Sequence, residues 1–122
     1  MSENQREHID VSELIKSFQQ ILEELKPLDD WNFSNAAKLD RLNNRRHSLV
    51  ADLIDLGLES NTSWAYGTDE TNREISIAQE TRPKRKKDAA INERFFYRAI
   101  GHLKDEIEMY ISSLREFIEK AK

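Results

Sequence analysis

The chain has 122 residues and a net charge of −4, with 38% hydrophobic residues, 34% charged residues and no cysteine. This length predicts a single domain over 1–122, and the lack of cysteine excludes disulfides, thiolate metal sites and cysteine nucleophiles. No apolar run approaches the roughly 18 residues of a membrane span, and the polar start of the sequence is unlike a signal peptide. We therefore expect a cytoplasmic protein without a membrane partner.

The whole chain contains only three glycines and two prolines, which favours long helices. The first helix is predicted over 10–26, where apolar residues recur at steps of three and four. Asp10 is a suitable N-cap, with Glu13 three residues later in the capping-box arrangement. Pro27 disfavours helical geometry at the residue before it, so we expect the helix to end there.

A second helix is predicted over 34–56, with Ser34 as its N-cap. Gly57 follows at a position where left-handed backbone is favoured, and Leu58 is placed to pack back on the last turn. A seam of leucines lies along this helix, and Arg46 interrupts it.

Arg46 therefore needs a partner within the predicted core. One interpretation is that its stem packs on the neighbouring leucines, or that its guanidinium pairs with a carboxylate of another helix and fixes register. Another is that Arg46 lines a polar pocket together with Asn43 and His47. Both interpretations depend on neighbours from other helices.

The stretch 59–88 contains six apolar residues in thirty, which are too few to build a core of its own. We expect a long polar connection here. A short strand around Ile75, or one or two helical turns in the same place, are the alternatives.

The third helix is predicted over 88–121, where apolar residues repeat at steps of four and three for almost four heptads. At ~1.5 Å per residue, about 15 Å of this helix extends beyond the second one and needs another cover. Either the 59–88 segment folds back with Trp64 and Tyr66, or a second copy of the chain packs there. We favour the homodimer, because long exposed seams are uncommon in monomers.

The predicted fold class is therefore all-α. We expect a three-helix antiparallel bundle, or a four-helix one with a short extra helix, in which the long C-terminal helix supports dimerisation. If the helices at 34–56 and 88–121 are antiparallel, the basic start of the former lies near the end of the latter.

The most specific local signal is a basic run directly before the third helix, made of Arg82, Lys84, Arg85, Lys86 and Lys87. Positive side chains at a helix start oppose the helix dipole, and an anion docked there would relieve this. The simplest interpretation is a solvated linker. The alternatives are contact with nucleic acid or another polyanion, with Arg41 and Arg45 as second contacts, and a targeting signal.

Aromatic residues supply the candidates for protein–protein contact: Trp64, Tyr66, Phe95, Phe96 and Tyr97. Trp64 and Tyr66 either anchor the 59–88 segment to the helices or stand exposed as binding hot spots. The other three lie near one end of the third helix.

Arg41 and His47, with five residues between them, resemble the R-x(4-6)-H signature of the HEPN superfamily, small all-helical bundles that include dimeric, metal-independent ribonucleases. The resemblance implies that Arg41 would stabilise charge developing on the phosphate and that His47 would assist proton transfer at the 2′-hydroxyl. It covers two residues, and Leu42 follows the Arg where the family usually carries a polar residue. Other catalytic templates, such as a Gly-rich phosphate loop or a nucleophile elbow, are absent from the sequence.

Metal binding is also poorly supported by the sequence. His102 and Glu106 share a helix face, and Glu116 with Glu119 forms an E-x-x-E pair, but a metal site needs converging ligands from other helices. We therefore predict no metal and no cofactor.

The leading functional hypothesis is a non-enzymatic helical-bundle interaction or regulatory protein, such as an adaptor, antitoxin or immunity-like protein, that acts through protein–protein contacts. The first alternative is a nucleic-acid-associated protein that uses the basic 82–87 segment. The second is a HEPN-like ribonuclease that uses Arg41 and His47.

Overall fold

The computed structural model describes residues 9–58, 62–79 and 86–121, without the side chains of 62–69 and 86–88. The described residues contain four helices and no strand, which confirms the all-α prediction. The helices are α2 (Val11–Leu25), α3 (Phe33–Asp55), α4 (Thr62–Ala78) and α5 (Lys86–Ala121). Within these ranges none of them has the length and apolar character that crossing a membrane requires.

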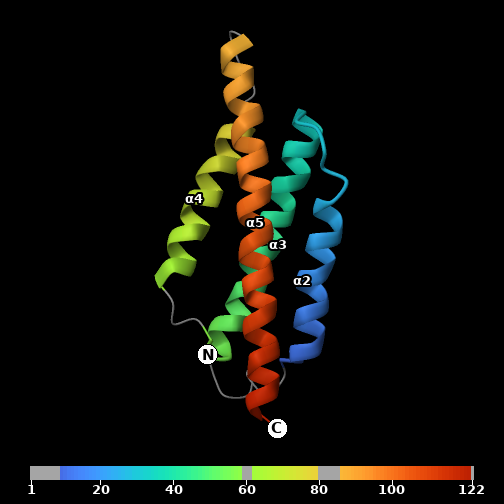
Figure 1. Ribbon diagram of the computed structural model, residues 1–122, viewed down its shortest axis with the longest axis vertical. Helices are drawn as coiled ribbons and strands as arrows, with labels where there is room; N and C mark the ends of the chain where they lie inside the picture. The colour runs from blue at the N-terminus through green and yellow to red at the C-terminus, as the bar shows by residue number, and fades with distance from the viewer. Residues whose placement is uncertain (1–8, 59–61, 80–85, 122) are drawn as a thin grey trace.

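The helices lie side by side and alternate in direction, so that α3 and α5 run the same way (Figure 1). The antiparallel arrangement of these two helices, under which the start of α3 would lie near the end of α5, is therefore not the one observed. The reason is that an additional long helix, α4, stands between them in the chain and reverses its direction once more. Both α3 and α5 begin at the upper end of the view.

The first two helices begin at side-chain caps. The Oδ1 of Asp10 accepts a hydrogen bond of 3.1 Å from the backbone N–H of Glu13, as predicted. At α3 the prediction of Ser34 as the N-cap is wrong. The helix begins at Phe33, and the N-cap is Asn32, whose side-chain oxygen accepts a hydrogen bond of 2.7 Å from the backbone N–H of Asn35. Asn caps a helix as well as Ser does, so the sequence offered two acceptable starts.

The end of α3 has the predicted glycine turn. Gly57 has a φ of +78°, its N–H donates to the carbonyl of Ile54 at 2.9 Å, and the N–H of Leu58 donates to the carbonyl of Leu53 at 3.0 Å. These two bonds form the Schellman pattern, which satisfies carbonyls left over at a helix end.

The largest difference from the sequence analysis lies in 59–88, which was expected to be a connection and contains the 17 residues of α4. The described buried residues of α4 follow helical spacing, but two of the four are polar: Thr71, Glu74, Ile75 and Ala78. The apolar residues therefore mark only half of the inward face of α4. The two polar residues contact polar side chains of α5: Thr71 binds Glu106, and Glu74 binds His102.

The helix α5 begins at Lys86, two residues earlier than predicted, and its 36 residues span about 54 Å. Its first turns extend beyond the other helices (Figure 1). It packs most extensively on α4 and next on α2. The length mismatch that led us to expect a second copy is thus largely met by α4, the other alternative that the sequence left open.

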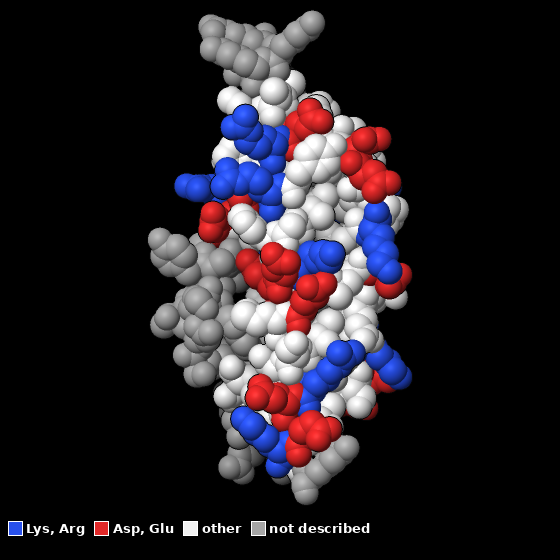
Figure 2. All heavy atoms as spheres, viewed as in Figure 1, with Lys and Arg blue, Asp and Glu red and all other residues white. Residues whose placement is uncertain are grey.

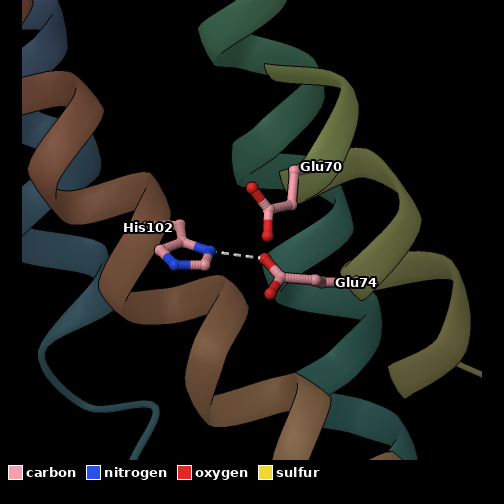
Figure 3. A group of neighbouring side chains, drawn as sticks. All are labelled: Glu70, Glu74 and His102. Carbon is pink, nitrogen blue, oxygen red and sulfur yellow. Dashed lines mark hydrogen bonds and ion pairs between the residues drawn. The ribbon is translucent and has the colours of Figure 1, made fainter. Parts of the chain in front are cut away.

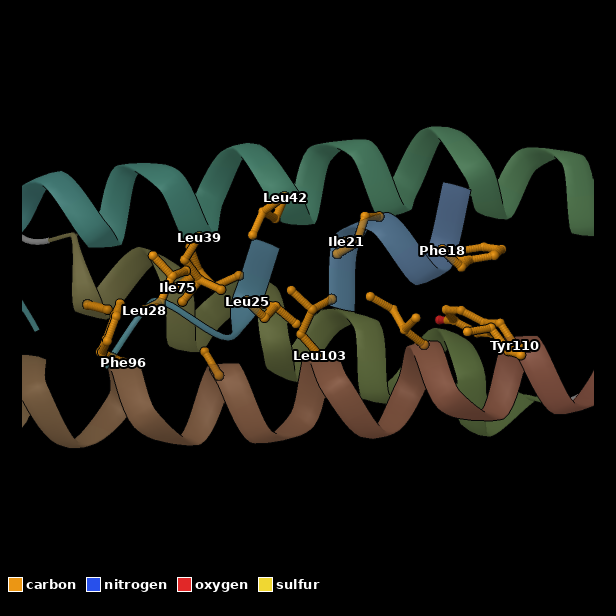
Figure 4. Close-up of a cluster of buried hydrophobic side chains, with 14 of the residues drawn as sticks. Phe18, Ile21, Leu25, Leu28, Leu39, Leu42, Ile75, Phe96, Leu103 and Tyr110 are labelled. Carbon is orange, nitrogen blue, oxygen red and sulfur yellow. The ribbon is translucent and has the colours of Figure 1, made fainter. Parts of the chain in front are cut away.

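One apolar core joins the helices (Figure 4). Leu39, Leu42 and Leu53 of the leucine seam in α3 are buried, whereas Leu49 and Leu56 are only partly buried. In α2 the ring of Phe18 lies 5.3 Å from that of Tyr110 in α5. The core also positions the Tyr110 hydroxyl beside the polar side chains described next.

Candidate functional site

Polar side chains are buried between α3, α4 and α5. In the described part of the chain the buried polar residues are Asn43, Arg46, Thr71, Glu74 and Asn92. Because an unpaired buried polar group costs free energy, each of them should have specific partners.

Arg46 is fully buried and forms the centre of the first group. Its Nη1 donates to Glu106 Oε2 at 2.7 Å and lies 3.4 Å from the hydroxyl of Tyr110. Its Nε donates to Asn43 Oδ1 at 3.1 Å, and its Nη2 donates to the same oxygen. The interpretation that Arg46 pairs with a carboxylate of another helix is confirmed.

Glu106 links α5 to both other helices. Besides Arg46, its carboxylate accepts a hydrogen bond of 2.9 Å from the hydroxyl of Thr71 in α4. Burial raises the pKa of Glu106, and the guanidinium of Arg46 and the Thr71 hydrogen bond only partly offset this. The charged form of the Glu106 carboxylate is therefore disfavoured by its burial despite the nearby guanidinium.

Asn72 of α4 connects two residues that stand one turn apart on α3, Asn43 and His47. Its Oδ1 accepts a hydrogen bond of 2.7 Å from Asn43 Nδ2 and lies 2.9 Å from His47 Nε2. Asn43, Arg46 and His47 thus share one polar environment, as the pocket interpretation proposed, and α4 supplies the fourth member.

A second group lies between α4 and α5 (Figure 3). Glu74 is 1% exposed, and its Oε1 lies 2.6 Å from His102 Nδ1. Its Oε2 accepts no hydrogen bond from the described residues, and Arg98 Nε lies 3.6 Å away. Glu70 stands one turn before Glu74, and one ligand atom from each of Glu70, Glu74 and His102 lies within 4.8 Å of the others.

The outer surface between α2 and α3 carries a groove with a volume of about 450 Å³. It is lined by Glu24, Pro27, Leu28, Asn35, Lys38, Arg41, Leu42 and Arg45. Arg45 Nη1 lies 2.5 Å from Glu24 Oε2, and this hydrogen bond lowers the pKa of Glu24. In the described structure, neither Lys38 nor Arg41 has a carboxylate partner within ion-pair distance.

The structure does not bring Arg41 and His47 together. Arg41 lines the groove beside α2, whereas His47 faces Asn72 of α4. His47 is six positions after Arg41, which places the two side chains about 120° apart around the helix axis, so they point to different neighbours. The proton-transfer and charge-stabilising roles implied by the HEPN resemblance would need both at one site.

The predicted partner-binding and basic residues divide into three classes. Phe96 is fully buried in the core and cannot contact a partner, whereas Tyr97 is 42% exposed and Phe95 is partly buried under the guanidinium of Arg98. Trp64 and Tyr66 lie in α4, and Lys86 and Lys87 begin α5, but these four side chains are outside the description. Arg82, Lys84 and Arg85 lie wholly outside the described residues.

Sequence reasoning missed Glu70, Thr71 and Glu74. Glu70 and Glu74 stand at i and i+4, the same spacing as His102 and Glu106, and this double pattern was the available signal. It became visible only once residues 62–78 were known to be helical.

Comparison of the chain with protein-family models, curated proteins and solved structures finds no match.

Proposed function

We propose that this protein is a non-enzymatic, adaptor-like or regulatory interaction protein, and that the α2–α3 groove binds an acidic, amphipathic segment of a partner protein. The observation that supports this most directly is the wall formed by Lys38, Arg41 and Arg45 above an apolar floor. Of these three cations, only Arg45 has an ion-pair partner among the described residues.

Lys38, Arg41 and Arg45 form one row along α3 because of their spacing in the sequence. Steps of three and four residues place Lys38, Arg41 and Arg45 on one face of α3, and all three are exposed. Acidic side chains of a partner segment would pair with Lys38 and Arg41, which have no carboxylate partner within ion-pair distance among the described residues. Such charge complementarity increases the association rate and selects against basic partners.

The floor of the groove supports a protein partner rather than a phosphate backbone. Leu28, Leu42 and Pro27 are the apolar residues of the lining, and the two leucines are almost fully buried. An apolar side chain of an amphipathic segment would pack on this floor. A phosphate backbone has no apolar side chain that could occupy this floor, whereas an amphipathic peptide has one.

Nucleic acid is the second candidate. The starts of α3 and α5 lie toward the same end of the molecule (Figure 1), so the helix that carries Arg41 and the helix that follows the basic 82–87 segment begin on the same side. On the face seen in Figure 2, positive side chains gather in the upper part, and acidic side chains lie directly beside and below them. A polyanion requires a more continuous basic surface.

Self-association forms part of the proposal. We propose that two copies contact each other through the start of α5, where Ile91 is 45% exposed and Tyr97 42% exposed. Because α4 already covers much of α5, this contact is expected to be small.

The groove is tested with a short fluorescein-labelled peptide that carries Leu and Glu at helical spacing, by fluorescence anisotropy. The K38Q/R41Q double variant should weaken binding roughly tenfold, because it removes two charge-assisted contacts. Glu24→Gln should strengthen binding, because it releases Arg45 and removes the repelling carboxylate. Replacing Leu by Ser in the peptide should also weaken binding.

The matched control is K104Q/K120Q, which makes the same charge change on exposed positions of α5. An equal loss of peptide affinity in both double variants would show that only net charge matters and would contradict binding in the groove. A single-stranded RNA of matched length forms the other arm, and binding of the RNA but not of the peptide would favour the nucleic-acid alternative instead.

A further inference from the structure

We propose that Glu70, Glu74 and His102 form a binding site for a divalent transition-metal ion, with Zn²⁺ as the representative ligand. The site lies between α4 and α5, away from the groove, and does not depend on the proposed function (Figure 3).

The geometry supplies ligands from two helices. Glu70 and Glu74 stand one turn apart on α4 and present their carboxylates to the same side, and His102 of α5 faces them (Figure 3). One ligand atom from each residue lies within 4.8 Å of the other two. Zn²⁺ binds nitrogen and oxygen ligands at about 2.0–2.2 Å, so ligand atoms around it are up to about 4 Å apart. Small side-chain rotations would bring these three atoms into that range around an ion.

The charge and burial of Glu74 provide a second, independent reason. This carboxylate is 1% exposed, yet its Oε2 accepts no hydrogen bond from the described residues. The nearest cation to that oxygen is Arg98 Nε, at 3.6 Å, and the Arg98 side chain is half exposed. A buried carboxylate is stabilised only when it is fully paired, and a bound cation would complete the pairing.

The chemistry of the ligand set indicates which ions fit. One imidazole nitrogen with two carboxylates suits Zn²⁺, Co²⁺ or Mn²⁺ better than Mg²⁺ or Ca²⁺, which prefer all-oxygen sites. Three protein ligands leave at least one position for water, as in open metal sites. The side chain of His102 is 40% exposed, so an ion can reach the site from solvent.

Residues around the three ligands are fixed by their own contacts. Glu106 lies one turn after His102 and is held by Arg46 and Thr71, and Thr71 directly follows Glu70 in α4. These bonds hold α4 and α5 in register beside the site. Such supporting contacts around the ligands are typical of metal sites in proteins.

The test uses the full chain after treatment with a chelator, which is then removed. Thermal unfolding is measured with and without Zn²⁺ at about 100-fold above its Kd, where binding to the folded state should raise the Tm by roughly 5–10 °C. Glu74→Gln and His102→Gln should each lose most of this rise. Co²⁺ provides a second readout, because its visible absorption reports nitrogen and oxygen coordination and should disappear in His102→Gln.

Two further variants separate a metal site from a structural role. Glu108→Gln removes an exposed carboxylate of the same helix and should keep the full Zn²⁺ effect. Arg98→Gln removes the competing cation next to Glu74 and should lower the Kd for Zn²⁺, whereas loss of a merely structural ion pair would leave the Kd unchanged. Because the readout is the change that Zn²⁺ produces, a variant with altered basal stability remains informative.

Three outcomes would overturn the proposal. The first is no change in Tm and no Co²⁺ absorption in the unmodified chain. The second is an equal rise in Glu74→Gln and His102→Gln, which would place the ion elsewhere. The third is an equal rise with Mg²⁺, which would contradict a site that contains imidazole.

Discussion

At the scale of single residues, the buried pair of Arg46 and Glu106 is the most consequential feature. Replacing Arg46 with Met leaves Glu106 at 12% side-chain exposure without its guanidinium partner. We expect a loss of about 3–5 kcal/mol in the free energy of unfolding, because the remaining charge stays buried. Urea denaturation measures this loss. The double variant R46M/E106L removes both charges and should recover much of the stability; equal stability of R46M and the unmodified protein would contradict the paired arrangement.

The same pair gives a pH prediction. The pKa of Glu106 is raised above its usual value of 4.5, so the folded state binds this proton more tightly than the unfolded state. The stabilising contribution of the proton is complete below the usual value and is lost as the pH rises through the folded-state pKa. Compared with Glu106→Gln, the unmodified protein should therefore lose stability between pH 4.5 and the raised pKa. An opposite slope, measured by urea denaturation at several pH values, would mean that Arg46 outweighs burial.

The sequence allowed Arg46 to be identified but not its partners. A single Arg in a seam of leucines is conspicuous, since every neighbouring seam position is apolar. Glu106, by contrast, is one of many carboxylates on α5, and nothing local distinguishes a buried one from an exposed one. The side chain of Glu74 was missed for the same reason.

At the scale of helices, two glycines make a matched pair. Gly101 lies inside α5, is exposed, and a Cβ there would meet no atom within 4 Å. Gly101→Ala should therefore stabilise the protein by about 0.5–1 kcal/mol, because Ala has the higher helix propensity. At Gly57 there is also free space, but the φ of +78° strains any residue with a Cβ, and Gly57→Ala should cost about 1 kcal/mol.

Urea denaturation of both variants tests this contrast under identical conditions. Effects of the same sign would contradict one of the two assignments, since the substitution is chemically identical and only the backbone conformation differs.

Gly57 also illustrates which features can be predicted from the sequence. A glycine followed by Leu after a leucine-rich helix predicts the turn directly, whereas α4 was not predicted because its inward face contains Thr71 and Glu74 beside Ile75.

At the scale of the whole molecule, α4 changes what the long C-terminal helix needs. The apolar repeat in 88–121 predicted a helix whose length exceeded its partners, and this remains correct. The sequence could not distinguish a covering helix of the same chain from a second copy. The face of α4 that packs on α5 contains polar as well as apolar residues, so no apolar repeat in the sequence marks it. With α4 in place, the large hydrophobic residues left exposed on α5 in its described part are Ile91 and Tyr97.

Dimerisation is consequently expected to be weak. Stable specific interfaces bury about 1,200–2,000 Å² in total, and two side chains at the start of one helix supply only part of this. Light scattering should give a mass near 14.4 kDa at low concentration and a rising mass at high concentration. I91S and Y97S should suppress the rise. I54S, at a residue 49% exposed near the opposite end of the molecule, should not. A doubled mass at every concentration, unchanged by I91S and Y97S, would require a different and larger contact surface.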